Sequence, residues 1–231
     1  MSKVTIIIPT YFNQKSISAL KEDILELKSK IKKENIDLQI ILIDDDSKDN
    51  TFEIIKENFL DIEDVILLKN SKNIGSWKSI KSALKYVNGD AFMFLAADRQ
   101  DPIEVVSQLI FEWKKGENIV IAERKNRVDT FMSKAFANLF LFIVRNFFFE
   151  KFPKNGFDIS IIDSKYLEFF RQSSGNYYIP FHIFWLGLKP KSIEYIREKR
   201  DHGKSRFTFK KKLDLVFDIF FSYSKIPVRI F

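Results

Sequence analysis

The sequence predicts an α/β fold built on a mostly parallel sheet flanked by helices. Short apolar runs alternate with amphipathic helical patterns through about the first 120 residues, which is typical of right-handed βαβ units. The run at 4–8 is rich in β-branched residues and free of charge, as expected of a strand buried on both faces. Two apolar runs end directly in carboxylates, where sheets of this class place ligand-binding groups.

The first half of the chain supplies most of the predicted elements. Pro9 ends the first strand, and the helix that follows carries apolar residues at steps of three and four. Ser16 or Ser18 is the expected N-cap of that helix. Strands are predicted at 4–8, 38–43, 65–68, 92–95 and 118–122, and helices at 16–32, 51–59, 77–87 and 103–115.

The pattern changes after Ala122. A Phe-rich helix is predicted at 131–149, strands at 159–163 and 192–196, and an amphipathic helix at 213–223. The segment at 197–212 is basic. No linker composition separates these elements from the first half, so we expect one domain over residues 1–231.

Composition and charge limit the class of protein. The chain is 45% hydrophobic and 30% charged with no Cys, which predicts a globular protein of a reducing compartment without thiolate metal sites. No apolar run reaches the roughly 18–20 residues of a membrane span. From residue 185 onward there are 12 Lys and Arg against five Asp and Glu, which equals the whole net charge of +7. This asymmetry predicts an anionic partner for the C-terminal segment.

Three loops that follow buried strands carry the polar residues of the predicted site. They hold Tyr11, then Asp44 and Asp45, then Asp98 and Gln100. The carboxyl ends of parallel strands meet at one edge of a sheet, so these groups should gather there. For the stretch at 92–102 alone, a buried strand followed by an Asp-Pro turn is also a valid interpretation. Together the carboxylates could bind a divalent cation, and arginines could hold a diphosphate.

Five motifs in order resemble those of family 2 glycosyltransferases. The start of the chain, VTIIIPTYFNQKSI, is similar to the family's opening, and ILIDDDSKDNT to its D-D-G-S-x-D-x-T element. Two further segments, KNIGSWKSIKSAL and LAADRQDP, resemble its R-N-x-G loop and D-A-D-L-Q-D-P element, which favours the branch of dolichol-phosphate mannose synthases and bacterial polyprenyl-phosphate glycosyltransferases. The fifth motif, R-x-x-R-x-x-G-x-S-K, corresponds to Arg197, Arg200, Gly203, Ser205 and Arg206.

The resemblance implies a GT-A type, Rossmann-like fold and a role for each matched residue. It implies a nucleotide-sugar-binding half at 1–122 and an acceptor and membrane-proximal half at 123–231. It implies nucleotide-sugar contacts at Pro9, Tyr11, Asp44, Asp45, Asn73, Gly75, Asp98 and Gln100. It implies metal ligands at Asp98 and Gln100, and a catalytic and phosphate-binding group of Asp98, Asp101, Arg124, Arg127, Arg197, Arg200 and Ser205. For each arginine the alternative is a solvated surface charge.

Three departures from the family pattern bear on these roles. Ala96 replaces the first aspartate of the D-A-D element, so the implied Mg²⁺ or Mn²⁺ has one carboxylate fewer, and we expect Asp98, Gln100 and the diphosphate to hold the ion. Gln14 stands where the family usually has Glu. The sequence ends at Phe231, where many relatives continue into membrane-spanning helices, so we expect a peripheral or shortened form.

The resemblance implies an inverting transfer of a sugar from a nucleotide donor to a polyprenyl phosphate. A lipid phosphate is already anionic and needs no general base; a sugar hydroxyl acceptor would, with Asp101 or Asp158 as candidates. The alternatives are such a hydroxyl-directed, polysaccharide-forming enzyme or a non-catalytic nucleotide-sugar-binding relative. The basic 210–212 run beside an apolar helical face fits either a membrane surface or packing on the domain, and predicts a cytoplasmic, peripheral protein. No interleaved aromatic and basic sheet motif occurs, so we expect no nucleic-acid partner.

Overall fold

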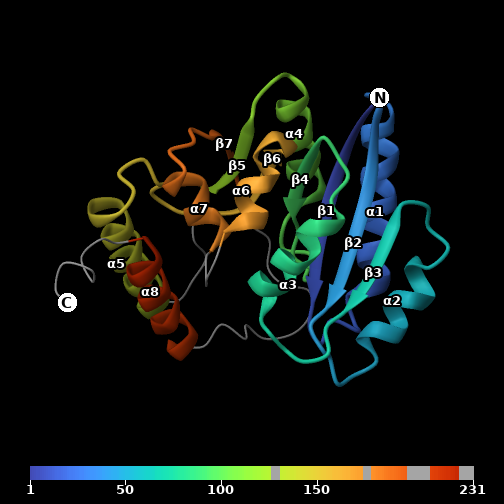
Figure 1. Cartoon of the computed structure of the whole chain (residues 1–231), viewed down its shortest axis with the longest axis horizontal. Helices are drawn as coiled ribbons and strands as arrows, with labels where there is room; N and C mark the ends of the chain where they lie inside the picture. Colours follow the sequence, from blue (N-terminus) through green and yellow to red (C-terminus); the bar gives the residue numbers. More distant parts are fainter. Residues whose placement is uncertain (126–130, 174–177, 197–208, 224–231) are drawn as a thin grey trace.

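The computed structural model describes residues 1–125, 131–173, 178–196 and 209–223, and it confirms the α/β fold (Figure 1). Seven strands form one sheet in the order β3-β2-β1-β4-β6-β5-β7. Only β6 among the described strands runs antiparallel to its neighbours, β4 and β5. The strands are β1 (Ser2–Thr10), β2 (Ile36–Asp44), β3 (Val65–Lys69), β4 (Ala91–Phe94), β5 (Ile119–Arg124), β6 (Phe157–Asp163) and β7 (Lys191–Tyr195). All seven predicted strands are therefore confirmed, with small shifts at their ends.

The helices agree with the prediction except at 77–87 and in the second half. The helix predicted at 77–87 is α3 followed by a 3-10 turn, and α6 and α7 were not predicted, because helices of six and seven residues are too short to display an apolar period. The helices are α1 (Ile17–Lys32), α2 (Thr51–Phe59), α3 (Ser76–Ala83), η1 (Leu84–Tyr86), α4 (Ile103–Lys114), α5 (Phe131–Phe147), η2 (Ser164–Tyr166), α6 (Leu167–Gln172), α7 (Ile179–Trp185) and α8 (Phe209–Tyr223).

The sheet separates two apolar cores. Alternate side chains of β1 enter opposite cores: Ile6 and Ile8 pack with α1, α2 and α4, and Ile7 packs with α3, α6 and α7. Figure 1 shows these two helical layers on the two faces of the sheet. Both faces of the central strands are therefore buried, which explains their uninterrupted apolar sequences.

Helices α5 and α8 lie beside each other at the end of the molecule away from β3 (Figure 1). Phe148, just after α5, contacts Phe220 of α8 with ring centroids 6.5 Å apart. Several large apolar side chains of this pair remain exposed to solvent: Leu139, Phe142, Phe147, Phe217 and Phe221. Within the described residues, no helix is both long and apolar enough to cross a bilayer.

The first turn of α1 is connected to the loop that follows β4. Ser16 occupies the N-cap position, as predicted, but its side chain does not cap the helix. Its buried hydroxyl instead donates to the carbonyl oxygen of Ala97 at 2.8 Å. The expected capping bond is thus replaced by one that fixes a loop of the predicted site.

Candidate active site at the carboxyl edge of the sheet

The topology brings the predicted site residues to one edge of the sheet. The parallel strands β1, β2, β4, β5 and β7 end at this edge, the lower one in Figure 1, and the antiparallel β6 begins there. The loops and strand ends there carry Tyr11, Asp45, Asp98, Arg124 and Asp158. Residues more than 140 positions apart in sequence therefore belong to one rim, as the carboxylate pattern predicted.

Asp44 closes the turn after β2. Its side chain is fully buried and accepts hydrogen bonds from the Ser47 hydroxyl at 2.5 Å and the Ser47 backbone N–H at 3.0 Å. Asp46, which stands at the family's usual glycine, has φ of 60° and forms an ion pair with Lys48. An aspartate tolerates this left-handed conformation better than most residues, so the turn forms without glycine.

Asp45 organises the neighbouring loop at 70–75. Its carboxylate accepts hydrogen bonds from the backbone N–H of Ile74 at 2.9 Å and of Gly75 at 2.8 Å, and from the Asn70 amide at 2.9 Å. The Asn73 amide donates to the Asp45 carbonyl oxygen at 3.2 Å. Gly75 has φ of 89°, which a residue with a side chain rarely adopts. The predicted nucleotide contacts at 45, 73 and 75 thus form one hydrogen-bonded unit.

The loop after β1 presents an aromatic side chain on the rim. Pro9 lies within β1, where it pairs in register with Ile43. Tyr11 is 36% exposed, and its ring meets Phe12 edge to face at 4.6 Å. A partly exposed aromatic ring beside buried carboxylates can stack on a nucleobase while polar groups read its edge.

An ion pair with α1 holds the loop after β4 in place. Arg99 adopts φ of 57°, and its guanidinium donates two hydrogen bonds to Asp23 of α1, at 2.5 and 2.9 Å. Asp98 and Gln100, on either side of Arg99, are half-buried. Such bidentate pairs fix geometry as well as adding energy. The role of Asp23 could not be predicted, because it lies on a charged helix 76 positions before Arg99.

A second hydrogen-bonded group joins the loop after β4 to the far strands. Arg124 at the end of β5 donates to both carboxylate oxygens of Asp158 in β6. The hydroxyl of Tyr195, at the end of β7, lies 2.7 Å from Asp158 Oδ2 and 3.0 Å from Asp101 Oδ1. Tyr195 is 4% exposed and was missed in the sequence, because its partners lie 94 and 37 positions away.

Comparison with known families decides the assignment. The model of the family described as "Glycosyl transferase family 2" matches residues 5–177, three quarters of the chain. The chain belongs to glycosyl transferase family 2. The predicted class of enzyme, a glycosyltransferase, is therefore confirmed.

Curated relatives of this family 2 glycosyltransferase extend over nearly its whole length. It is 29% identical over 98% of its length to an uncharacterized glycosyltransferase, YkcC, of Bacillus subtilis, and covers 70% of that protein. It is 27% identical over 99% of its length to a prophage bactoprenol glucosyl transferase homolog of Escherichia coli, covering 74%. It is 25% identical over its full length to an undecaprenyl-phosphate 4-deoxy-4-formamido-L-arabinose transferase of Proteus mirabilis, covering 70%.

A solved structure confirms the predicted GT-A type fold of the family 2 chain. The glucosyl-3-phosphoglycerate synthase of Mycobacterium tuberculosis, solved with Mn²⁺, UDP-glucose and phosphoglyceric acid, superposes with a TM-score of 0.61 at 12% identity. The match covers 93% of this chain and 76% of that one. At this identity the likeness concerns the fold.

Four predicted residues of the family 2 site lie outside the described part of the chain. They are Arg127, Arg197, Arg200 and Ser205. Their grouping around a phosphate therefore stays a prediction. Among the described residues, no group of three or more His, Cys, Asp and Glu side chains could by itself hold a metal ion.

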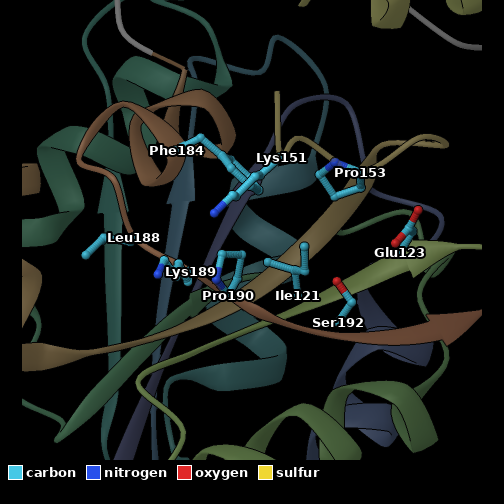
Figure 2. A pocket seen from close by; sticks show the side chains of 9 residues that line it. All are labelled: Ile121, Glu123, Lys151, Pro153, Phe184, Leu188, Lys189, Pro190 and Ser192. Carbon is cyan, nitrogen blue, oxygen red and sulfur yellow. The ribbon is translucent and has the colours of Figure 1, made fainter. Parts of the chain in front are cut away.

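A pocket of about 250 Å³ lies between β5, β7 and the turn before β6 (Figure 2). Figure 2 shows Phe184 and Lys151 on one side of the pocket and Ile121, Pro190 and Lys189 on the other. None of the predicted nucleotide-sugar residues lines this pocket.

Proposed function

We propose that the chain transfers a sugar from a nucleoside-diphosphate sugar to a polyprenyl phosphate. The observation that carries this proposal is that relatives named as bactoprenol and undecaprenyl-phosphate sugar transferases match the chain over 99% or more of its length. The joining of the loop after β4 to the ends of β5, β6 and β7 supports it, because donor and acceptor must meet at one rim.

The donor nucleotide is proposed to bind between the loops after β1, β2 and β3. Tyr11 offers an exposed ring for the base, and the unit of Asp45, Asn73 and Gly75 offers polar groups for its edge. In this arrangement Asp45 contributes partly by holding the loop at 70–75 in position. Asp44, whose carboxylate is taken up by Ser47, contributes by shaping the turn.

The residues present fit a divalent cation that is held jointly with the donor. Asp98 and Gln100 offer hard oxygen ligands, and Mg²⁺ or Mn²⁺ commonly completes its shell with water and substrate phosphates. The bound ion would neutralise charge on the leaving diphosphate. Restoring the first aspartate of the family's D-A-D element with Ala96→Asp, at a half-buried position, should therefore strengthen Mn²⁺ binding in the presence of a nucleoside diphosphate.

The acceptor is proposed to be an anionic lipid phosphate, which attacks the anomeric carbon without help from a base and inverts its configuration. Arg124, held in place by Asp158, is an oriented cation beside this rim, and a guanidinium remains charged and can grip phosphate with two donors. Asp101 and Asp158 both contact the Tyr195 hydroxyl, which suits groups that position their neighbours. Arg127, Arg197, Arg200 and Ser205 are proposed to complete the phosphate-binding group.

The exposed apolar face of α5 and α8 is proposed to bind the inner, cytoplasmic surface of the membrane. Phe142, Phe147, Phe217 and Phe221 are each more than half exposed there, and the basic run at 210–212 belongs to the start of α8. Apolar side chains that enter the headgroup region and lysines that meet anionic lipids would act together.

The experiment is a transfer assay with a panel of UDP- and GDP-sugars, each with and without a short polyprenyl phosphate, in Mg²⁺, Mn²⁺ or EDTA. We expect one donor to give a lipid-extractable product only with the lipid phosphate present. Product formed on a free sugar acceptor would replace the lipid assignment by a hydroxyl-directed reaction. Donor binding without turnover in every condition would identify a non-catalytic relative.

A further inference from the structure

A stretch in the first half of the chain is basic although that half as a whole is slightly acidic, with 17 basic and 20 acidic residues over positions 1–122. Residues 65–89 contain five lysines and neither Asp nor Glu, whereas the chain has 38 basic and 31 acidic residues in total. This stretch forms β3, the loop at 70–75, α3 and η1. The charge therefore concentrates on one small part of the surface.

Three of these lysines share one face of α3 and η1. Lys78, Lys81, Ser82 and Lys85 follow the spacing of i, i+3, i+4 and i+7, which places them along one side of a helix. Arg171 of α6 faces them, and the five residues line an open pocket of about 430 Å³. The opposite face of α3 is buried against the sheet, so this basic groove is the side that the fold leaves accessible.

Contacts within the fold support the positions of three of the cations in the groove, Arg171, Lys81 and Lys85. Arg171 donates to the Leu84 carbonyl oxygen at 3.1 and 3.0 Å and forms an ion pair with Glu168 at 2.6 Å. Lys81 is half-buried and donates to the carbonyl oxygen of Ser173. Lys85 lies 4.9 Å from the centre of the Tyr86 ring. Two elements about 90 residues apart in sequence, η1 and α6, are thus joined beside the groove.

The helix dipole does not account for this arrangement. Lysines near the C-terminal end of a helix are favourable, which suits Lys81 and Lys85. Lys78, however, lies in the first turn of α3, where a positive charge is unfavourable. Like charges three and four positions apart also repel, and no residue that lines the groove carries a carboxylate.

The geometry points to an anion site in this groove, separate from the donor rim, that binds a phosphate group. Several ammonium donors suit a multiply charged tetrahedral oxyanion, which accepts hydrogen bonds from several directions, whereas the Ser82 hydroxyl beside them donates to the Ser79 carbonyl oxygen at 2.7 Å. None of the residues proposed for the donor or acceptor lines the groove, so the inference does not depend on the proposed function. The phosphate can belong to an anionic lipid headgroup or to a soluble phosphorylated compound.

Lysine acetylation read by mass spectrometry on the full chain tests the site directly, with inorganic pyrophosphate as the probe and EDTA present. We expect saturating pyrophosphate to slow modification of Lys78, Lys81 and Lys85 about threefold or more, and to leave Lys30 and Lys33 of the α1 region unchanged. A nucleoside diphosphate with Mn²⁺ added in place of EDTA should not remove this protection. Equal protection at both places, or none at either, would overturn the inference.

Binding by charge-matched variants supplies a second test. The triple change of Lys78, Lys81 and Lys85 to Gln should weaken pyrophosphate binding about tenfold, whereas the same change at Lys21, Lys30 and Lys33 should leave it within about twofold. The double variant K78Q/K85Q, which alters only exposed side chains, guards against misfolding and should still lose most of the affinity. Equal losses in the groove and α1 variants would refute a specific site.

Vesicles identify the source of the phosphate. If it is a lipid headgroup, phosphatidylglycerol vesicles should bind the chain, the groove variants should bind them more weakly than the α1 variants, and pyrophosphate should compete. If the phosphate belongs to a soluble compound, both sets of variants should bind the vesicles equally, while only the groove variants should lose affinity for pyrophosphate.

Discussion

Replacing Tyr195 by Phe removes one hydroxyl from the centre of the candidate active site. This hydroxyl is buried and lies 2.7 Å from Asp158 and 3.0 Å from Asp101. A hydrogen bond to a charged group contributes about 1.5–3 kcal/mol, and one hydroxyl hydrogen serves one carboxylate at a time, so the free energy of unfolding should fall by about 2 kcal/mol. For a domain of this size the midpoint of thermal unfolding should fall by about 4–8 °C.

Urea unfolding and transfer kinetics measure the two consequences. The change loosens the connection between the loop after β4 and the ends of β6 and β7, so kcat should fall by about 10–100-fold, with the donor KM changed much less. Tyr86→Phe is the matched control, because Tyr86 is 38% exposed and its loss of a hydroxyl should change stability by less than about 0.5 kcal/mol. Equal stability and equal kcat for Tyr195→Phe and Tyr86→Phe would refute the role assigned to Tyr195.

Three further predictions concern stability and the donor loops. Burial lowers the pKa of His182 from about 6.5 to about 4, so between these pH values the unfolded chain binds a proton that the folded chain does not. The free energy of unfolding should therefore fall by about 2 kcal/mol from pH 7 to pH 5. His182→Phe should flatten this pH dependence, which urea unfolding at each pH measures. Gly75→Ala meets no neighbouring atom but forces alanine to φ of 89°, which should cost about 1–2 kcal/mol and raise the donor KM more than it lowers kcat. Asp23→Asn removes the partner of Arg99, so the affinity for nucleoside diphosphate with Mn²⁺ should fall by about tenfold in calorimetry, and an unchanged affinity would contradict the positioning role.

The parallel strands could be predicted because each strand is recognisable from its own residues. The run at 4–8 sends Ile6 and Ile8 into one core and Ile7 into the other, and a strand buried on both faces has no polar alternation to confuse the interpretation. Helices α6 and α7 were missed because their six and seven residues sit in an aromatic-rich stretch without a visible period. The antiparallel direction of β6 likewise depends on pairing with β4 and β5, which no local pattern records.

The same distinction applies to the candidate site. The carboxylates at 45 and 98 were found because each follows a buried strand directly, and the topology then brings their loops to one rim. The hydrogen-bond partners of the carboxylates in the candidate site could not be predicted. Asp45 holds the backbone of the loop at 70–75, and Tyr195 joins Asp101 to Asp158 across 94 and 37 positions, through contacts that exist only after folding.

The rim around Asp98 is proposed to transfer a sugar to a lipid phosphate, and single-turnover transfer of labelled sugar to a polyprenyl phosphate measures this activity. The wild-type chain should give a lipid-extractable product that EDTA abolishes. Asp98→Asn should lower the rate by about 100-fold, whereas Asp61→Asn, an exposed change on the α2–β3 connection, should leave it within about twofold. A full rate for Asp98→Asn, or donor binding without product in the wild-type chain, would contradict the account.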